Sequence, residues 1–188
     1  MFSVVIATHD SERALVPTLA ALIPGATAGV VREVIVADAG SRDDTAGIAD
    51  VAGCRFVVSS QPFGARLAAA AGSARGTWLM FLAPGVVPEP TWIDETVRFD
   101  EGAERGGAAR AAVFAASAGG LLASLRRAVG ALPQPTQGLL IPKLFYDALG
   151  GHRAHVADPE TDLLRRIGRR RIATLRSAAL VPVIDVVN

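Results

Sequence analysis

Short apolar segments alternate along the chain with longer segments in which apolar residues recur every three or four positions. The first apolar segment, residues 2–8 (FSVVIAT), is rich in β-branched residues and has no alternating polar positions. This pattern is typical of a strand that is buried on both faces of a sheet. Residues 11–23 follow with three leucines at helical spacing behind Ser11, a residue suited to an N-cap. A strand followed by a helix is therefore predicted at the start of the chain.

The same alternation continues through the next three apolar segments. Strands are predicted at residues 31–38, 54–60 and 77–83, and helices at residues 41–52, 64–76 and 91–107. In the first of these helices Ser41 lies three residues before Asp44, a spacing that resembles a capping box. Strands that alternate with helices indicate an α/β fold with a parallel sheet and right-handed crossovers.

The second half of the chain has a weaker pattern. Residues 108–132 are rich in alanine and predict no clear element, and their longest uncharged run, residues 111–125, is too short for a convincing membrane span. Attachment of this run to a membrane surface is left as an alternative. A short strand and a short helix are predicted within residues 137–151, a helix at residues 158–168, and strand-like sequence beyond residue 170.

Composition and charge narrow the class of protein. A chain of 188 residues with 51% apolar and 20% charged residues suits one globular domain, which we expect to span residues 1–188. A formal net charge of +1 gives no general reason to expect nucleic acid as a partner. Cys54 is the single cysteine and is expected to be a buried thiol, and the N-terminus lacks the pattern of a signal peptide. Both observations indicate a cytoplasmic location.

Polar residues follow the first two predicted strands. Thr8, His9 and Asp10 come at the end of the first strand, and Asp38 ends the second. Ligands of an open α/β sheet bind at the carboxyl ends of its strands, so these residues are candidates for a binding site. The fourth strand is followed instead by residues 83–85, Ala-Pro-Gly, which can neither bind a metal nor transfer a proton.

The order and spacing of several segments resemble those of the family 2 glycosyltransferases. The matching segments are residues 3–22, 33–45, 64–95, 137–152 and 158–170, whereas residues 100–133 match poorly. The resemblance implies the GT-A fold, a Rossmann-like and mostly parallel sheet flanked by helices. It also implies transfer of a sugar from a nucleotide-diphosphate donor to an acceptor hydroxyl, usually with inversion at the anomeric carbon.

The resemblance further implies that residues 8–10 and Asp38 lie around the base and the ribose of the donor nucleotide. A carboxylate at a strand end accepts hydrogen bonds from an imide N–H or from hydroxyl groups. Asp38 is accordingly the first candidate for the donor site. Its alternative role is that of a carboxylate that caps a turn or a helix.

Members of this family usually hold a divalent metal, Mg²⁺ or Mn²⁺, against the diphosphate with an Asp-x-Asp pair after the fourth strand. The matching positions here are Ala83 and Gly85, so the ligand pair is missing. Arg66, Lys143 and His152 are predicted to approach the site and to offset the phosphate charge in place of the metal. The alternative for each of these side chains is a solvated surface position.

The family also places an acidic pair at the start of a late helix, where the aspartate takes the proton of the acceptor hydroxyl. Alignment on the segment DPETDLL puts Pro159 and Glu160 at these positions, which makes Glu160 the candidate general base. Asp158 is the rival candidate, with helix capping as its alternative role.

Arginines at positions 165, 166 and 169–171 form the one strongly basic cluster of the sequence. The cluster is a candidate for peripheral contact with an anionic membrane surface or with a lipid phosphate. The alternative is a solvated helix end, where positive charge is favourable.

The sequence leaves two functions open. The protein is either an active transferase with a nucleotide-sugar donor and an undetermined acceptor, or a catalytically inactive nucleotide-binding or interaction module on the same scaffold. The missing carboxylates at Ala83 and Gly85 favour the second function, and the acidic residues of segment 158–162 oppose it.

Overall fold

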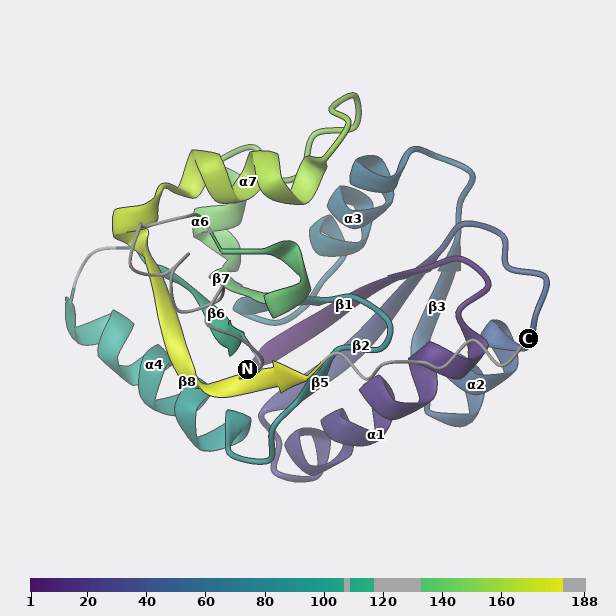
Figure 1. The fold of residues 1–188 in the computed structure, drawn as a ribbon, viewed down its shortest axis with the longest axis horizontal. Coiled ribbons are helices and arrows are strands. Elements are labelled where there is room, and N and C mark those ends of the chain that lie inside the picture. Colours follow the sequence, from purple (N-terminus) through teal and green to yellow (C-terminus); the bar gives the residue numbers. More distant parts are fainter. Residues whose placement is uncertain (107–108, 117–132, 181–188) are drawn as a thin grey trace.

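The computed structural model describes residues 1–106, 109–116 and 133–180 (Figure 1). At the centre lies an eight-stranded mixed sheet with the order β3-β2-β1-β4-β7-β6-β8-β5. The strands are β1 (Phe2–Thr8), β2 (Val31–Asp38), β3 (Arg55–Val58), β4 (Trp78–Leu82), β5 (Val87–Pro88), β6 (Ala111–Ala116), β7 (Leu139–Pro142) and β8 (Ile172–Leu180). The helices are α1 (Glu12–Thr27), α2 (Thr45–Val51), α3 (Phe63–Gly72), α4 (Trp92–Gly106), α6 (Lys143–Ala148), α7 (Pro159–Ile167) and the 3₁₀ helices η1 (Pro135–Gln137) and η2 (Arg169–Arg171).

One half of the sheet is parallel and the other half is mixed. β1 pairs in parallel with β2 and β4, and β2 pairs in parallel with β3. β7 runs antiparallel to both β4 and β6, β5 runs antiparallel to β8, and β6 and β8 are parallel. The architecture confirms a mostly parallel α/β sheet flanked by helices, in which β7 and β5 run antiparallel to their neighbours.

Helices cover both faces of this sheet, as Figure 1 shows. Side chains alternate in direction along a strand, so Val4 and Ile6 face the core beneath α1, α2 and α4, while Val5 faces the core beneath α3, α6 and α7. Both faces of β1 are therefore buried, which explains the absence of polar alternation in the first apolar segment. Cys54 packs against the core beneath α1, and burial raises the pKa of its thiol to about 11.

β6 lies in the alanine-rich segment for which the sequence predicts no element. Ala111, Ala112, Val113 and Phe114 are fully buried, with β7 and β8 as the neighbouring strands. Pairing within the sheet overrides the weak strand propensity of alanine. Residues 111–114 are buried in the sheet and so do not form a surface that could attach to a membrane. Residues 117–125 of this run lie outside the described residues. No helix in the described part of the chain is long and apolar enough to cross a membrane.

Two helix ends differ from those expected from the sequence. α1 continues to Thr27, beyond the predicted end at residue 23, and α3 ends at Gly72 rather than at residue 76. Gly76 packs instead against the first strand, where an added Cβ would lie 2.6 Å from the backbone nitrogen of Ser3. The close approach of α3's exit to β1 therefore requires a glycine that the helix itself does not need.

Candidate functional site

The carboxyl ends of β1, β2 and β4 lie at one edge of the sheet because these strands are parallel. Thr8 pairs with Asp38 at this edge. The start of β7 lies there too, since Leu139 pairs with Phe81 near the end of β4. We call this the carboxyl edge; the loops after β1 and β2 and the turn after β4 meet there.

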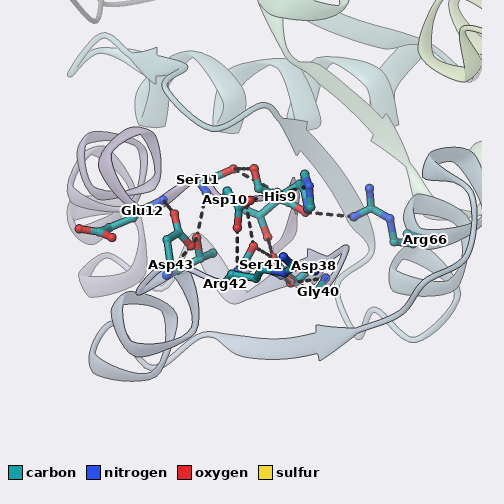
Figure 2. A network of polar contacts seen from close by, with 12 residues as sticks. His9, Asp10, Ser11, Glu12, Asp38, Gly40, Ser41, Arg42, Asp43 and Arg66 are labelled. Carbon is teal, nitrogen blue, oxygen red and sulfur yellow. Dashed lines mark hydrogen bonds and ion pairs between the residues drawn. The ribbon is translucent and has the colours of Figure 1, made fainter. Parts of the chain in front are cut away.

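Asp38 ties the loops after β1 and β2 together (Figure 2). Its Oδ1 accepts hydrogen bonds from the backbone N–H groups of Gly40 and Ser41, each at 2.7 Å, and its Oδ2 accepts from the hydroxyls of Thr8 and Ser41. Asp38 is only 1% exposed. Burial raises the pKa of this carboxyl, but the hydrogen bonds from Ser41, Thr8 and Gly40 outweigh burial and lower the pKa below its ordinary value. Asp38 is thus ionised, and both of its carboxylate oxygens accept hydrogen bonds from other groups of the protein.

His9 and Asp10 are the residues of the first loop that face solvent. Their side chains are 65% and 49% exposed. Asp10 has a φ of 46°, which is uncommon for a residue other than glycine. Its backbone N–H donates to the Ser41 hydroxyl, and its Oδ1 accepts from the backbone N–H of Arg42 at 2.7 Å. The loop therefore exposes His9 and Asp10 on a support that Ser41 and Asp38 hold in place.

The predicted caps of the first two helices are wrong. Ser11 makes no side-chain hydrogen bond to α1, and Ser41 turns toward the carboxyl edge instead of capping α2. Asp43 caps both helices instead, because its Oδ2 accepts a hydrogen bond from the backbone N–H of Glu12 and its Oδ1 accepts one from the backbone N–H of Thr45. These are the first residues of α1 and α2. A single carboxylate thus joins the starts of the two helices.

Arg66 reaches the carboxyl edge from α3 and is 9% exposed. Its Nη1 donates to the carbonyl oxygens of Thr8, at 3.2 Å, and of Ala37. Figure 2 shows Arg66 pointing toward the loop that carries His9 and Asp10. Its Nε is buried without a partner among the described residues. Burial lowers the pKa of Arg66, and the charge of Asp38 opposes this effect. Arg66 is therefore a buried cation at the strand ends, as predicted, and not a solvated surface group.

Lys143 lies at the opposite edge of the sheet. β7 is antiparallel to β4, so Pro142 at its end pairs with Trp78 at the start of β4. The backbone N–H of Lys143 donates to the carbonyl of Thr77 at 2.8 Å, and its Nζ pairs with Asp147 at 3.3 Å. The prediction that Lys143 approaches the donor site is therefore wrong, because the strand that carries it runs away from the carboxyl edge.

A small pocket lies between α7 and the carboxyl edge. Its volume is about 10 Å³, roughly the space that one water molecule needs. It is lined by Phe81, Gln134, Pro135, Gly138, Leu139, His152, Glu160 and Leu164. The pocket brings together two of the predicted site residues, His152 and Glu160, which come from different segments.

Glu160 has the properties of a proton acceptor that works near neutral pH. Burial, followed by the negative charge of Asp158, raises the pKa of Glu160 to about 7. Its carboxyl has no hydrogen-bond partner among the described residues. The rival Asp158 caps α7 instead, because its Oδ1 accepts from the backbone N–H of Thr161 at 3.0 Å. The two carboxylates therefore take different roles in the same helix start.

His152 lines the pocket as a neutral group. It is 4% exposed, and burial together with the charge of Arg166 lowers its pKa to about 3, although Asp162 opposes the shift. The predicted cationic role is therefore wrong for His152. Its Nδ1 lies 2.9 Å from the hydroxyl of Tyr146. The sequence did not indicate this partner, because the two residues are six positions apart and no periodic pattern joins them.

The turn after β4 packs against α1. Gly85 has a φ of 86°, and its N–H donates to the carbonyl of Ala14 and to the hydroxyl of Thr18, each at 2.9 Å. The described residues contain no group of three or more His, Cys, Asp or Glu side chains that could hold a metal ion. The side chains of this turn therefore do not fit the metal site that an Asp-x-Asp pair would form.

The arginine cluster is divided between structural and exposed side chains. Arg166 binds Asp162 and two backbone carbonyls of the turn after α6. Arg171 donates to the carbonyl of Ile167 at the end of α7 and stacks over the ring of Phe145. Arg171 is exposed and matches the alternative of a solvated helix end, whereas Arg166 is a partly buried side chain that joins α7 to the turn after α6. The arginines at positions 165, 169 and 170 are exposed.

Comparisons with known proteins identify a sequence family and several structures with a similar fold. The family described as Glycosyl transferase family 2 matches residues 3–138. The structure of glucosyl-3-phosphoglycerate synthase from Mycobacterium tuberculosis, in complex with Mn²⁺, UDP and glucosyl-3-phosphoglycerate, has a TM-score of 0.68 and 23% identity over 93% of this chain and 68% of that chain. S. aureus TarS 1–349 has a TM-score of 0.69 and 16% identity over 95% of this chain and 59% of that chain. At these identities the likeness shows the fold. Among curated proteins, none matches this chain in sequence.

Proposed function

The chain belongs to glycosyl transferase family 2, and from this premise we propose that it transfers a sugar from a nucleotide-diphosphate donor to a hydroxyl group of an acceptor. The observation that carries the proposal is Glu160. Its carboxyl lines a pocket at the carboxyl edge, has no partner among the described residues, and has a pKa raised to about 7. A carboxyl that lines a pocket and has a pKa near 7 has the two properties that a general base needs.

In the proposed complex the nucleotide lies on the loops after β1 and β2. His9 and Asp10 are the exposed polar groups of these loops, so they contact the base and the ribose. Asp38, Thr8 and Arg66 act beneath them as positioning residues, because their polar atoms already bind one another or the strand ends. The related synthase from Mycobacterium tuberculosis was solved with UDP, which supports a nucleotide diphosphate as the donor class.

The proposed transfer is a single displacement. Glu160 accepts the proton of the acceptor hydroxyl, while the oxygen of that hydroxyl forms a bond to the anomeric carbon. The bond from that carbon to the diphosphate oxygen breaks, and its electron pair leaves with the nucleotide diphosphate. Attack on the face opposite to the leaving group inverts the anomeric configuration, as is usual in the family that the sequence resembles.

A metal has no assigned place in this mechanism. The synthase complex contains Mn²⁺, but the carboxylates of an Asp-x-Asp pair are replaced here by Ala83 and Gly85, and the described residues offer no other ligand cluster. The leaving diphosphate must then be stabilised by donors of the chain itself. Arg66 supplies positive charge from beneath this edge, through the field of its buried guanidinium group and not by direct contact with the diphosphate.

A second function is favoured by the turn after β4. Because Gly85 has a left-handed backbone and its N–H is bound to α1, this turn is built for packing and not for catalysis. An inactive nucleotide-binding or interaction module on the same scaffold is therefore the alternative.

Two measurements separate the two functions. Calorimetric titration with UDP and with GDP, each with Mn²⁺ and with a chelator, tests donor binding. Release of UDP from UDP-glucose, or of GDP from GDP-mannose, tests chemistry, with Glu160→Gln as the matched variant. Binding together with release that depends on Glu160 supports the transferase, whereas binding without release supports the inactive module. Absence of both in a folded sample contradicts nucleotide binding by either function.

A further inference from the structure

Tyr146 and His152 form a buried pair beneath the pocket that contains Glu160. Tyr146 is 3% exposed and His152 is 4% exposed. The Tyr146 hydroxyl accepts a hydrogen bond from the backbone N–H of His152 at 3.0 Å and lies 2.9 Å from Nδ1 of the same residue. The His152 ring packs edge-on against Phe81 with the ring centroids 4.7 Å apart. The position of the imidazole is therefore set by the hydrogen bond at Nδ1 and by contacts with the rings of Phe81 and Tyr146.

The hydrogen bonds also determine which ring nitrogen carries the proton. The phenol of Tyr146 has one hydrogen and already accepts the backbone N–H of His152. Among the described residues its only remaining partner is Nδ1, so the hydroxyl donates to Nδ1. Burial raises the pKa of Tyr146 to about 12, so the phenol keeps its hydrogen at neutral pH. Because His152 is neutral, its single ring proton is then on Nε2.

Nε2 is the ring nitrogen of His152 that is left for a partner outside the described residues. Nε2 makes no hydrogen bond to a described residue. Among the described residues, the buried side-chain nitrogen and oxygen atoms that lack a hydrogen-bond partner are Nε of Arg55 and Nε of Arg66, so Nε2 of His152 is not fully buried. His152 lines the pocket together with Glu160. A pocket the size of one water molecule is thus bordered by a residue with a free N–H donor and a residue with a carboxylate acceptor, and a hydroxyl group can bind to both kinds of group at once.

We propose that Tyr146 is a positioning residue that holds His152 as the Nε2–H tautomer, so that His152 donates a hydrogen bond to the same acceptor oxygen from which Glu160 takes the proton. This proposal rests on the proposed transferase function. The His152 donor occupies one lone pair of the hydroxyl oxygen and Glu160 binds its hydrogen, which leaves the second lone pair to attack the anomeric carbon. A freely rotating hydroxyl would have to find this orientation by chance.

The tautomer is tested by NMR of ¹⁵N-labelled histidine, independently of activity. The spectrum of His152→Gln identifies the His152 signals among those of the three histidines. We expect the wild type to carry the ring proton on Nε2 alone from about pH 5 to about pH 8, since a neutral buried imidazole does not titrate in this range. Tyr146→Phe removes the donor to Nδ1 and should give a mixture of tautomers or a titrating ring. A wild-type ring protonated on Nδ1, or a Tyr146→Phe spectrum with an unchanged tautomer, overturns the proposal.

The catalytic part is tested by donor hydrolysis, in which water occupies the place of the acceptor hydroxyl. With UDP-glucose and GDP-mannose as probes, Tyr146→Phe and His152→Phe should lower kcat about tenfold, the loss expected for one hydrogen bond, with KM for the donor unchanged. His152→Gln keeps an N–H donor and should lose less than His152→Phe. Equal rates for His152→Phe and the wild type overturn the proposal. If the wild type releases no nucleotide although the tautomer is as expected, the proposed function fails and the catalytic part fails with it.

The fold of each variant is checked first, because Tyr146 is buried. The near-ultraviolet circular dichroism and the unfolding midpoint of Tyr146→Phe must resemble those of the wild type. If Tyr146→Phe does not fold, His152→Phe and His152→Gln decide the outcome, since both keep Tyr146 and differ in the N–H donor. Equal loss in these two variants overturns the proposal.

Discussion

Replacement of Asp38 by alanine separates a structural role of this residue from direct contact with the nucleotide. In the folded protein the carboxylate accepts four hydrogen bonds, from two backbone N–H groups and two hydroxyls, and it is 1% exposed. Each hydrogen bond of this kind contributes about 1 kcal/mol, and those to a charged group about 1.5 to 3 kcal/mol. The hydroxyls of Thr8 and Ser41 can turn to other acceptors, so we expect a total loss of about 3 to 5 kcal/mol.

The assay is denaturant and thermal unfolding of Asp38→Ala. A loss of this size should lower the midpoint by about 10 °C for a chain of this length. Because the folded pKa of Asp38 is lowered, its contribution is present above the unfolded pKa and is lost as the pH falls below about 4. The variant should therefore approach the wild type in stability under acid conditions. Asp50→Ala is the matched control, because Asp50 is exposed on the neighbouring helix α2.

Two results would refute the reasoning. If Asp38→Ala unfolds like the wild type but binds UDP or GDP about 1 to 3 kcal/mol more weakly, Asp38 contacts the nucleotide directly and does not hold the loops. If Asp50→Ala is destabilised as strongly as Asp38→Ala, the hydrogen bonds of Asp38 are not the cause. Loss of stability in Asp38→Ala alone supports its role as the carboxylate that joins the loops after β1 and β2.

Four further outcomes are expected. Because the pKa of Glu160 is raised to about 7, donor hydrolysis should rise with pH through this value, and Glu160→Gln should lower the rate about 100-fold or more and remove the pH dependence; a wild-type rate in this variant contradicts the assignment. The same raised pKa means that Glu160 binds its proton more tightly in the folded state than in the unfolded state, so the stability of the protein falls as the pH rises from about 4.5 to about 7. In calorimetry, Glu160→Gln should therefore have a higher melting temperature than the wild type at pH 8 but not at pH 4. Gly85→Ala should destabilise the protein by about 1 to 2 kcal/mol because φ is 86°, whereas Gly102→Ala in α4 should not; equal midpoints of these two variants contradict strain at Gly85. UDP affinity should change less than about threefold between Mn²⁺ and chelator, since the described residues hold no ligand cluster, and strong metal dependence would mean that other side chains bind the ion.

Much of the fold was predictable because buried strands and amphipathic helices leave different patterns. β1, β2 and β4 are apolar on both faces, and α7 was expected from the spacing of Leu163, Leu164 and Ile167. β6 was missed because its six residues, AAVFAA, are small and have no strong propensity, and only the neighbouring strands make them a strand. Local composition predicts an element where its own side chains decide the conformation.

The candidate site was located in part for the same reason. Strand ends are visible in the sequence, so Asp38 and residues 8–10 were expected at one edge, and Glu160 followed from the resemblance of its segment. Lys143 was placed wrongly because the direction of β7 is not written in its residues. The charge of His152 was also wrong, since burial and Arg166 lower its pKa to about 3 and neither is visible locally.

The sequence by itself determined the class of the fold, the edge at which the polar loops gather and the absence of carboxylates at residues 83–85, because each of these depends on residue type and order along the chain. The tertiary structure alone decided what the side chains do there. Asp38 turns inward to bind the loops, Tyr146 meets His152 beneath the pocket, and Glu160 is left without a partner among the described residues. Hydrogen-bond partners, burial and the resulting pKa shifts depend on distances between segments, and those distances exist only once the chain has folded.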